Sequence, residues 1–120
     1  VQRVRQAKAD STVSKQIRNI CDYIGMHITE KLSIEELAGR AGYTEYYFSH
    51  KFKKEMGVSV NEYIHREKLD HAKLLLTTGK MSVQEISTEL AFGSRSYFST
   101  AFHKYVGCSP REYREKNLKL

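Results

Sequence analysis

Residues 93–114 read GSRSYFSTAFHKYVGCSPREYR, and a related stretch, TEYYFSHKFKKEMGVSVNEYI, occupies residues 44–64. Extending the alignment towards the N-terminus pairs residues 33–43 with residues 82–92, so one unit of sequence occurs twice. Eleven of the 32 paired positions are identical, and others pair one apolar residue with another, such as Ile34 with Val83. Two copies are too few for a solenoid, which needs at least about three stacked repeats. We therefore expect two similar subdomains.

Capping residues mark where the helices of both copies begin. The pattern Ser-x-x-Glu is a capping box, in which the serine and the glutamate close the first helical turn together. Four such boxes are present, and they begin at Ser33, Ser59, Ser82 and Ser109. Thr44 and Ser94 are two further N-cap residues by type and position. Six helix starts are therefore predicted.

An amphipathic segment that begins at Val13 adds a seventh helix, because Ile17, Ile20 and Ile24 recur on one helical face. The prediction is an all-α fold with helices at residues 13–27, 34–41, 45–56, 60–78, 83–90, 95–106 and 110–118. Glycine often ends a helix in a left-handed conformation. Such stops are expected at Gly57, Gly79 and Gly107.

The composition excludes several classes of protein. The chain has 120 residues, a net charge of +6 and two cysteines, Cys21 and Cys108. The longest aliphatic run, Leu74 to Leu76, is far short of the roughly 20 apolar residues that span a membrane. Two cysteines rule out a disulfide framework and a four-cysteine zinc site, and no two histidines are spaced as a metal-binding pair. We expect a cytoplasmic protein without a membrane contact, metal site or cofactor.

Each copy has the order of a helix-turn-helix motif, a short capped helix, a tight turn and a longer helix. In DNA-binding motifs of this kind, the second helix enters the major groove. We call residues 45–56 and 95–106 the reading helices. At 100° per residue, Phe48 and Phe52 lie on the core side of the first, and Phe98 and Phe102 on that of the second. The opposite faces lack Asp and Glu and consist of Tyr46, Ser49, His50 and Lys53 in the first copy and Ser96, Ser99, Thr100 and His103 in the second.

Charge and spacing favour DNA as the partner. In both copies the helix before the turn is net acidic, whereas the reading helix with its N-cap is net basic, +1 for residues 44–56 and +2 for residues 94–106. The expected helix at 60–78 would be about 28 Å long at roughly 1.5 Å per residue. Successive major-groove openings on one face of B-DNA lie about 34 Å apart. Two unequal reading helices in one chain predict an asymmetric binding site.

Residues 33–114 resemble the DNA-binding domain of AraC/XylS-type transcription regulators, in which a long linker helix joins two helix-turn-helix subdomains. The most specific part is residues 93–114, similar to the family's signature of an aromatic pair, Phe, Lys, Gly, Ser-Pro and Tyr-Arg. Residues 34–64 and the linker-helix residues Ala72 and Leu74 to Leu76 are similar as well. The resemblance implies sequence-specific binding of double-stranded DNA in a bacterial transcription regulator.

The resemblance also implies positions for the contacts. Base-facing side chains would be Tyr46, Ser49 and His50 in the first reading helix and Arg95, Ser96, Ser99 and Thr100 in the second, with Lys53 and His103 near phosphates. His50 and Thr100 stand where the family often has Arg, and Lys68 stands where Arg often precedes Leu69. Because Arg makes the bidentate contact to guanine, Arg95 becomes the best candidate for that contact.

The expected organisation is a linker or tail at 1–12 and a DNA-binding domain at 13–120. Within the domain, the first subdomain covers about 13–58, the linker helix about 59–78 and the second subdomain about 79–120. His65 and His71 are expected at the surface of the linker helix.

The family resemblance implies a preceding N-terminal sensory domain, and RNA polymerase is a further candidate partner. No catalytic group is found; the alternative function is a helical protein-interaction module that binds no nucleic acid.

Overall fold

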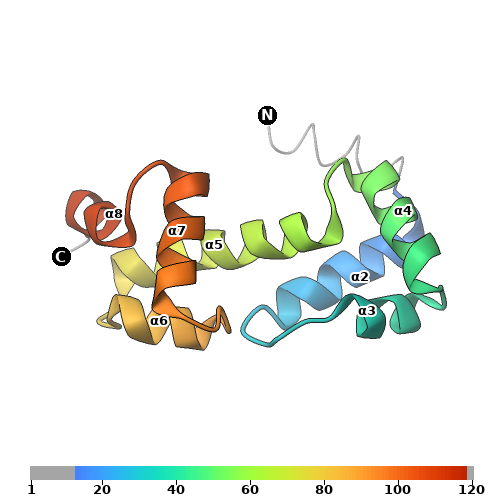
Figure 1. Ribbon diagram of the computed structural model, residues 1–120, viewed down its shortest axis with the longest axis horizontal. Coiled ribbons are helices and arrows are strands. Elements are labelled where there is room, and N and C mark those ends of the chain that lie inside the picture. The colour runs from blue at the N-terminus through green and yellow to red at the C-terminus, as the bar shows by residue number, and fades with distance from the viewer. Residues whose placement is uncertain (1–12, 119–120) are drawn as a thin grey trace. The chain divides into compact units, whose positions relative to one another are not determined.

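The computed structural model describes residues 13–118, and the expected linker or tail at 1–12 lies outside the described residues. Within this range the chain forms seven α-helices (Figure 1), which confirms the all-α prediction. Their ends agree with the predicted ranges to within two residues. The helices are α2 (Lys15–Met26), α3 (Ile34–Ala41), α4 (Glu45–Met56), α5 (Val60–Thr78), α6 (Val83–Glu89), α7 (Arg95–Val106) and α8 (Pro110–Asn117).

The described chain forms two compact units. Unit 1 contains residues 13–27 and Leu32–Ile64, and unit 2 contains Ile28–Lys31 and residues 65–118. Helix α5 is continuous over 19 residues, so its first turn belongs to unit 1 and the remainder to unit 2. Each unit therefore has one short helix and one reading helix joined by a turn, α3 and α4 in unit 1 and α6 and α7 in unit 2.

The aromatic core of the repeat has nearly the same geometry in both units. In unit 2 the fully buried Phe102 ring lies 5.8 Å from the Phe98 ring and 5.6 Å from the Tyr113 ring, centroid to centroid. The equivalent distances in unit 1 are 5.9 and 5.5 Å, and they join Phe48, Phe52 and Tyr63. The sequence repeat is thus a structural repeat, in which the same inward face of the reading helix supplies the core.

The predicted N-caps close the helices as expected. Reciprocal capping boxes form at Ser82 and Ser109, where the glutamate side chain also accepts from the serine amide. At Ser33 and Ser59 the hydroxyl accepts from the amide three residues later. The hydroxyls of Thr44 and Ser94 do the same at the starts of the two reading helices. Six predicted N-cap hydroxyls therefore fix where six of the seven helices begin, although at Ser33 the Glu36 carboxylate accepts from the Tyr23 hydroxyl and closes no reciprocal box.

Two of the three predicted glycine stops are left-handed. Gly57 and Gly107 end the reading helices with φ values of 83° and 100°. The prediction is wrong for Gly79, which is absent from the positive-φ residues of the described chain. Its amide donates to the Leu75 carbonyl at 3.3 Å, which continues the helical bonding pattern, and a Cβ would lie 3.3 Å from that oxygen. At this position the short distance to the backbone, and not the sign of φ, favours glycine.

The helix-turn-helix turns have the same hydrogen bonds but different residues at the left-handed position. In unit 1 this position is Gly42, with φ 80°, and the next amide, of Tyr43, donates to the carbonyl five residues before it. In unit 2 it is Ala91, with φ 57°, followed by the same bond from Phe92. A residue with a Cβ is strained there by roughly 1 to 2 kcal/mol. The second turn therefore has backbone strain at Ala91, whereas glycine at position 42 avoids this strain in the first turn.

Exchanging the two residues should change stability in opposite directions. Ala91→Gly should raise the free energy of unfolding by up to about 1 kcal/mol, because relief of left-handed strain exceeds the added backbone entropy of glycine. Gly42→Ala should lower it by about 1 kcal/mol or more. No atom lies within 4 Å of a Cβ built at Gly42, so the cost is in the backbone itself. Urea denaturation of each variant measures both changes.

Gly39→Ala is the matched control for this pair. Gly39 lies inside α3, and a Cβ there also meets nothing within 4 Å, but its φ is not in the left-handed region. Alanine is favoured over glycine by about 1 kcal/mol inside a helix. Gly39→Ala should therefore stabilise the protein, and destabilisation by both Gly→Ala changes would contradict the backbone explanation.

Candidate nucleic-acid interface

The nine side chains predicted to contact DNA all lie outside the buried cores of the units. Seven of them are exposed, and two serines at equivalent positions, Ser49 and Ser99, are half-buried. The exposed ones are Tyr46, His50 and Lys53 on α4 and Arg95, Ser96, Thr100 and His103 on α7. Because the phenylalanines of α4 and α7 are fully buried, these polar faces point away from the core of their own unit.

Tyr46 and His50 form an ordered pair on the outer face of α4. The imidazole Nδ1 lies 2.9 Å from the Tyr46 carbonyl oxygen, and the two rings are 4.1 Å apart between centroids. A carbonyl oxygen only accepts hydrogen bonds, so Nδ1 must carry the proton. Tyr46 is 75% exposed. The His50 ring is therefore held in one orientation by a residue that is itself open to a partner.

A groove of about 440 Å³ runs beside these residues in unit 1. It brings three of the predicted side chains, Ser49, His50 and Lys53, to one place. Its other lining residues are Ile34, Lys54, Ser59, Val60 and Asn61. Sequence reasoning did not assign Lys54 and Asn61 to the site. The identity of Lys54 with its repeat equivalent Lys104 was the signal that could have found the first of them.

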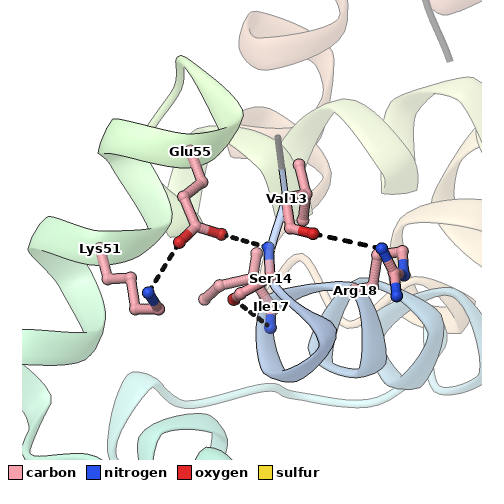
Figure 2. Close-up of polar contacts among 6 residues, drawn as sticks. All are labelled: Val13, Ser14, Ile17, Arg18, Lys51 and Glu55. Atoms are coloured by element: carbon pink, nitrogen blue, oxygen red, sulfur yellow. Dashed lines mark hydrogen bonds and ion pairs between the residues drawn. The ribbon is translucent and has the colours of Figure 1, made fainter. Parts of the chain in front are cut away.

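Lys51, the third lysine of α4, is engaged inside unit 1. Its Nζ lies 2.8 Å from one Glu55 oxygen, and the other oxygen accepts from the Ser14 amide at 2.8 Å, at the start of α2. Figure 2 shows the Glu55 carboxylate between the two donors. Burial acts to raise the pKa of Glu55, but the hydrogen bonds from Lys51 and Ser14 outweigh it, so the pKa is lowered. Lys53 and Lys54 are therefore the exposed cations of this helix.

The linker-helix residue His65 lies against the reading helix of unit 2. Its Nε2 is 3.1 Å from the Tyr97 hydroxyl, and its ring stacks on Phe92 at 6.0 Å. His65 is half-buried at the surface of α5, and the sequence did not indicate its contacts with Phe92 and Tyr97. His65 thus helps to orient the first turn of α7, next to the exposed Arg95.

Lys68 is a buried cation in unit 2. Its side chain is 5% exposed, and Nζ donates to the carbonyls of Ile28 at 2.6 Å, Glu30 at 2.9 Å and Leu90 at 2.7 Å. Burial lowers the pKa of Lys68 to about 8, and the charge of Glu30 partly opposes this. The ammonium joins the segment 28–31 and the end of α6 to α5. Lys68 therefore has a structural role in unit 2.

Residues 13–118 contain no group of three or more His, Cys, Asp or Glu side chains placed to hold a metal ion. In the same range, no helix is both long enough and apolar enough to cross a membrane.

A family model described as a helix-turn-helix domain matches residues 37–116, which is most of the repeat and the whole linker helix. The chain belongs to the AraC-type helix-turn-helix family. This confirms the resemblance that the sequence carries at residues 33–114. The AraC-type family is one of transcription-regulator domains.

Curated relatives of this AraC-type domain are transcription regulators. An uncharacterised HTH-type transcriptional regulator of Staphylococcus aureus is 31% identical over 99 residues, which are 82% of this chain and 13% of that protein. The regulatory protein PocR of Salmonella typhimurium is 32% identical over 107 residues, 89% of this chain and 34% of that protein. The chain thus spans a minor part of the length of these relatives.

Solved AraC-type domains have the same fold. The C-terminal domain of AraT, a response regulator from Geobacillus stearothermophilus, is 28% identical with a TM-score of 0.85, and the match covers 90% of each chain. The DNA-binding domain of AdpA, a global transcriptional factor solved in complex with a target DNA, is 25% identical with a TM-score of 0.81. That match covers 86% of this chain and 93% of the AdpA chain.

Proposed function

We propose that this AraC-type domain binds double-stranded DNA sequence-specifically, as the DNA-binding domain of a transcription regulator. The observation that carries the proposal is the pair of exposed, acid-free faces on α4 and α7. Both faces offer donors and acceptors at the same positions of a repeated helix-turn-helix. The AdpA domain, which has this fold and was solved on a target DNA, supports the same function here.

We assign direct base readout to one set of side chains and phosphate contacts to another. The base-reading set is Tyr46, Ser49 and His50 on α4 and Arg95, Ser96, Ser99 and Thr100 on α7. Lys53 and His103 bind phosphates, and Lys54 joins them because it lines the same groove as Lys53. The 19 residues of α5 would be about 28 Å long, which suits two reading helices in successive major grooves of an asymmetric site.

In the whole protein, this domain would act in the cytoplasm under the control of an N-terminal sensory domain. The support is the length of the curated relatives, of which the chain matches only 13% and 34%. RNA polymerase is the further partner that transcription activation would require. No residue of the described chain is assigned to that contact.

Selection from a random DNA pool tests the function, and two variants test the assigned roles. Arg95→Ala should relax the base preference at one position and cost about 1 to 3 kcal/mol there. Lys53→Gln should weaken binding to every sequence and reduce the slope of log K against log salt by about 1. Binding of the selected site across a salt series, measured by fluorescence anisotropy, gives both effects.

Lys51→Gln is the matched control for Lys53→Gln. It removes the same charge from the same helix, but the Lys51 ammonium is bound to Glu55 and its side chain is only 22% exposed. We expect the salt slope of Lys51→Gln to stay at the wild-type value.

If Arg95→Ala and Lys53→Gln weakened binding to all sequences equally, the assigned roles would be wrong. If no sequence were enriched, the domain would be an interaction module without DNA binding.

A further inference from the structure

The free nitrogen of His50 has a defined hydrogen-bonding character. Nδ1 donates its proton to the Tyr46 carbonyl at 2.9 Å, so in the neutral imidazole the other nitrogen, Nε2, carries no proton and is an acceptor. Among residues 13–118, the structure shows no hydrogen-bond partner for Nε2. The Tyr46 ring at 4.1 Å supports the imidazole from one side. The exposed nitrogen is therefore a pre-oriented acceptor on the outer face of α4.

Bases differ in what they offer such an acceptor in the major groove. Cytosine presents the N4 amino group and adenine the N6 amino group, whereas guanine presents O6 and N7 and thymine presents O4, all of them acceptors. An acceptor facing a base edge is satisfied by the two amino bases. Against the two keto bases it is left opposite another acceptor, with no hydrogen bond and an unfavourable approach of two lone pairs.

We propose that His50 makes unit 1 select an amino base, cytosine or adenine, over guanine or thymine at one position of its DNA site. The proposal rests on the DNA-binding function proposed above and names what one side chain of that site recognises. An arginine side chain only donates hydrogen bonds and pairs with guanine. Replacing His50 by arginine should therefore reverse the base preference at this position.

The test compares the DNA sites that wild-type protein and two His50 variants select at pH 8. Wild-type protein should enrich cytosine or adenine at one position, by about fivefold, as one hydrogen bond allows. His50→Phe keeps a ring against Tyr46 and removes the acceptor, so it should make that position indifferent and leave the others unchanged. His50→Arg should enrich guanine at the same position, and the strand that carries this guanine is the one on which the wild-type preference for cytosine or adenine is read. Because His50 is exposed, we expect both variants to fold, and circular dichroism checks this.

Thr100→Val is the matched control, because Thr100 occupies the equivalent position of α7. It should affect a different position of the selected site and leave the His50 position unchanged. A wild-type preference for guanine or thymine on the strand where His50→Arg enriches guanine would overturn the acceptor assignment. If His50→Phe relaxed no position, His50 would not read a base. Both results leave DNA binding intact, whereas failure of the wild-type protein to enrich any DNA would overturn the proposed function itself.

Discussion

Phe102→Ala should lower the free energy of unfolding of unit 2 by about 3 to 5 kcal/mol, in the usual range for truncating a buried phenylalanine. The ring is fully buried, and it packs between Phe98 and Tyr113, so it joins α7 to α8. It also belongs to a core that includes Leu76 of α5 and Ile86 of α6. Removing the ring opens a cavity in this core, beside Phe98 and Tyr113. Thermal unfolding should show the midpoint falling by at least about 10 °C.

Phe52→Ala is the matched variant in unit 1, where the equivalent ring packs on Phe48 and Tyr63. Amide hydrogen exchange, resolved by residue, distinguishes the two variants. We expect Phe102→Ala to lower protection mainly in α6, α7 and α8, and Phe52→Ala mainly in α2, α3 and α4, because each unit has its own core. The same uniform loss in both variants would contradict two separate cores and indicate one cooperative unit joined through α5.

Lys68→Met should destabilise the protein by about 2 to 3 kcal/mol near neutral pH. Methionine fills a similar volume but cannot donate, so three carbonyl oxygens lose their partner, and that of Leu90 is in a buried bond. A buried acceptor without a partner costs roughly 1 to 3 kcal/mol, and part of the total is offset because a buried charge is removed as well. Urea denaturation followed by circular dichroism measures the loss.

The pH dependence of that difference has a definite sign. The folded-state pKa of Lys68, about 8, is lower than the roughly 10.4 of an unfolded lysine, so between these values the unfolded chain binds more protons. The wild-type free energy of unfolding should therefore rise with pH from 8 towards 10, by up to about 3 kcal/mol from this group. Lys68→Met lacks this titration, so the gap between wild type and variant should widen over the same range.

Lys68→Arg is the control for the loss of hydrogen bonds. Arg keeps the charge and offers five donors, so it should retain much of the stability that methionine loses. Its guanidinium does not titrate in this range, so the rise between pH 8 and 10 should disappear. A Lys68→Met variant as stable as wild type at pH 7 would show that the three carbonyl contacts contribute no net stability.

Local sequence signals predicted the helices because each signal acts within a single turn of the chain. Ser82 and Ser109 close capping boxes with residues only three positions away, and the spacing of Phe98 and Phe102 fixes which face of α7 is buried. The repeat then extended each local prediction to its counterpart. For the same reason, the outer faces of α4 and α7 could be listed in advance.

Contacts between distant segments could not be predicted in this way. Glu55 binds the backbone amide of Ser14, 41 positions away, and Lys68 binds carbonyls at positions up to 40 residues away. Every residue has a backbone carbonyl and all but proline have an amide, so the residue type at a position does not indicate that its backbone will bind a distant side chain. The contact of His65 with Tyr97 was missed for a related reason, since it depends on how the start of α7 meets α5. The net charge of residues 44–56 likewise could not show which of the three lysines of α4 is bound to Glu55.

The strained turn at Ala91 has an evolutionary consequence. Alanine and glycine codons differ only at their second base, so a single nucleotide change would relieve the left-handed strain of the second helix-turn-helix turn. Selection acts on whether a protein stays above the stability it needs, and small available gains are often left unused. A single nucleotide change in the gene would therefore give a more stable protein. The stability gained from Ala91→Gly could compensate for a destabilising substitution in α7 that altered the DNA sequence recognised by the domain.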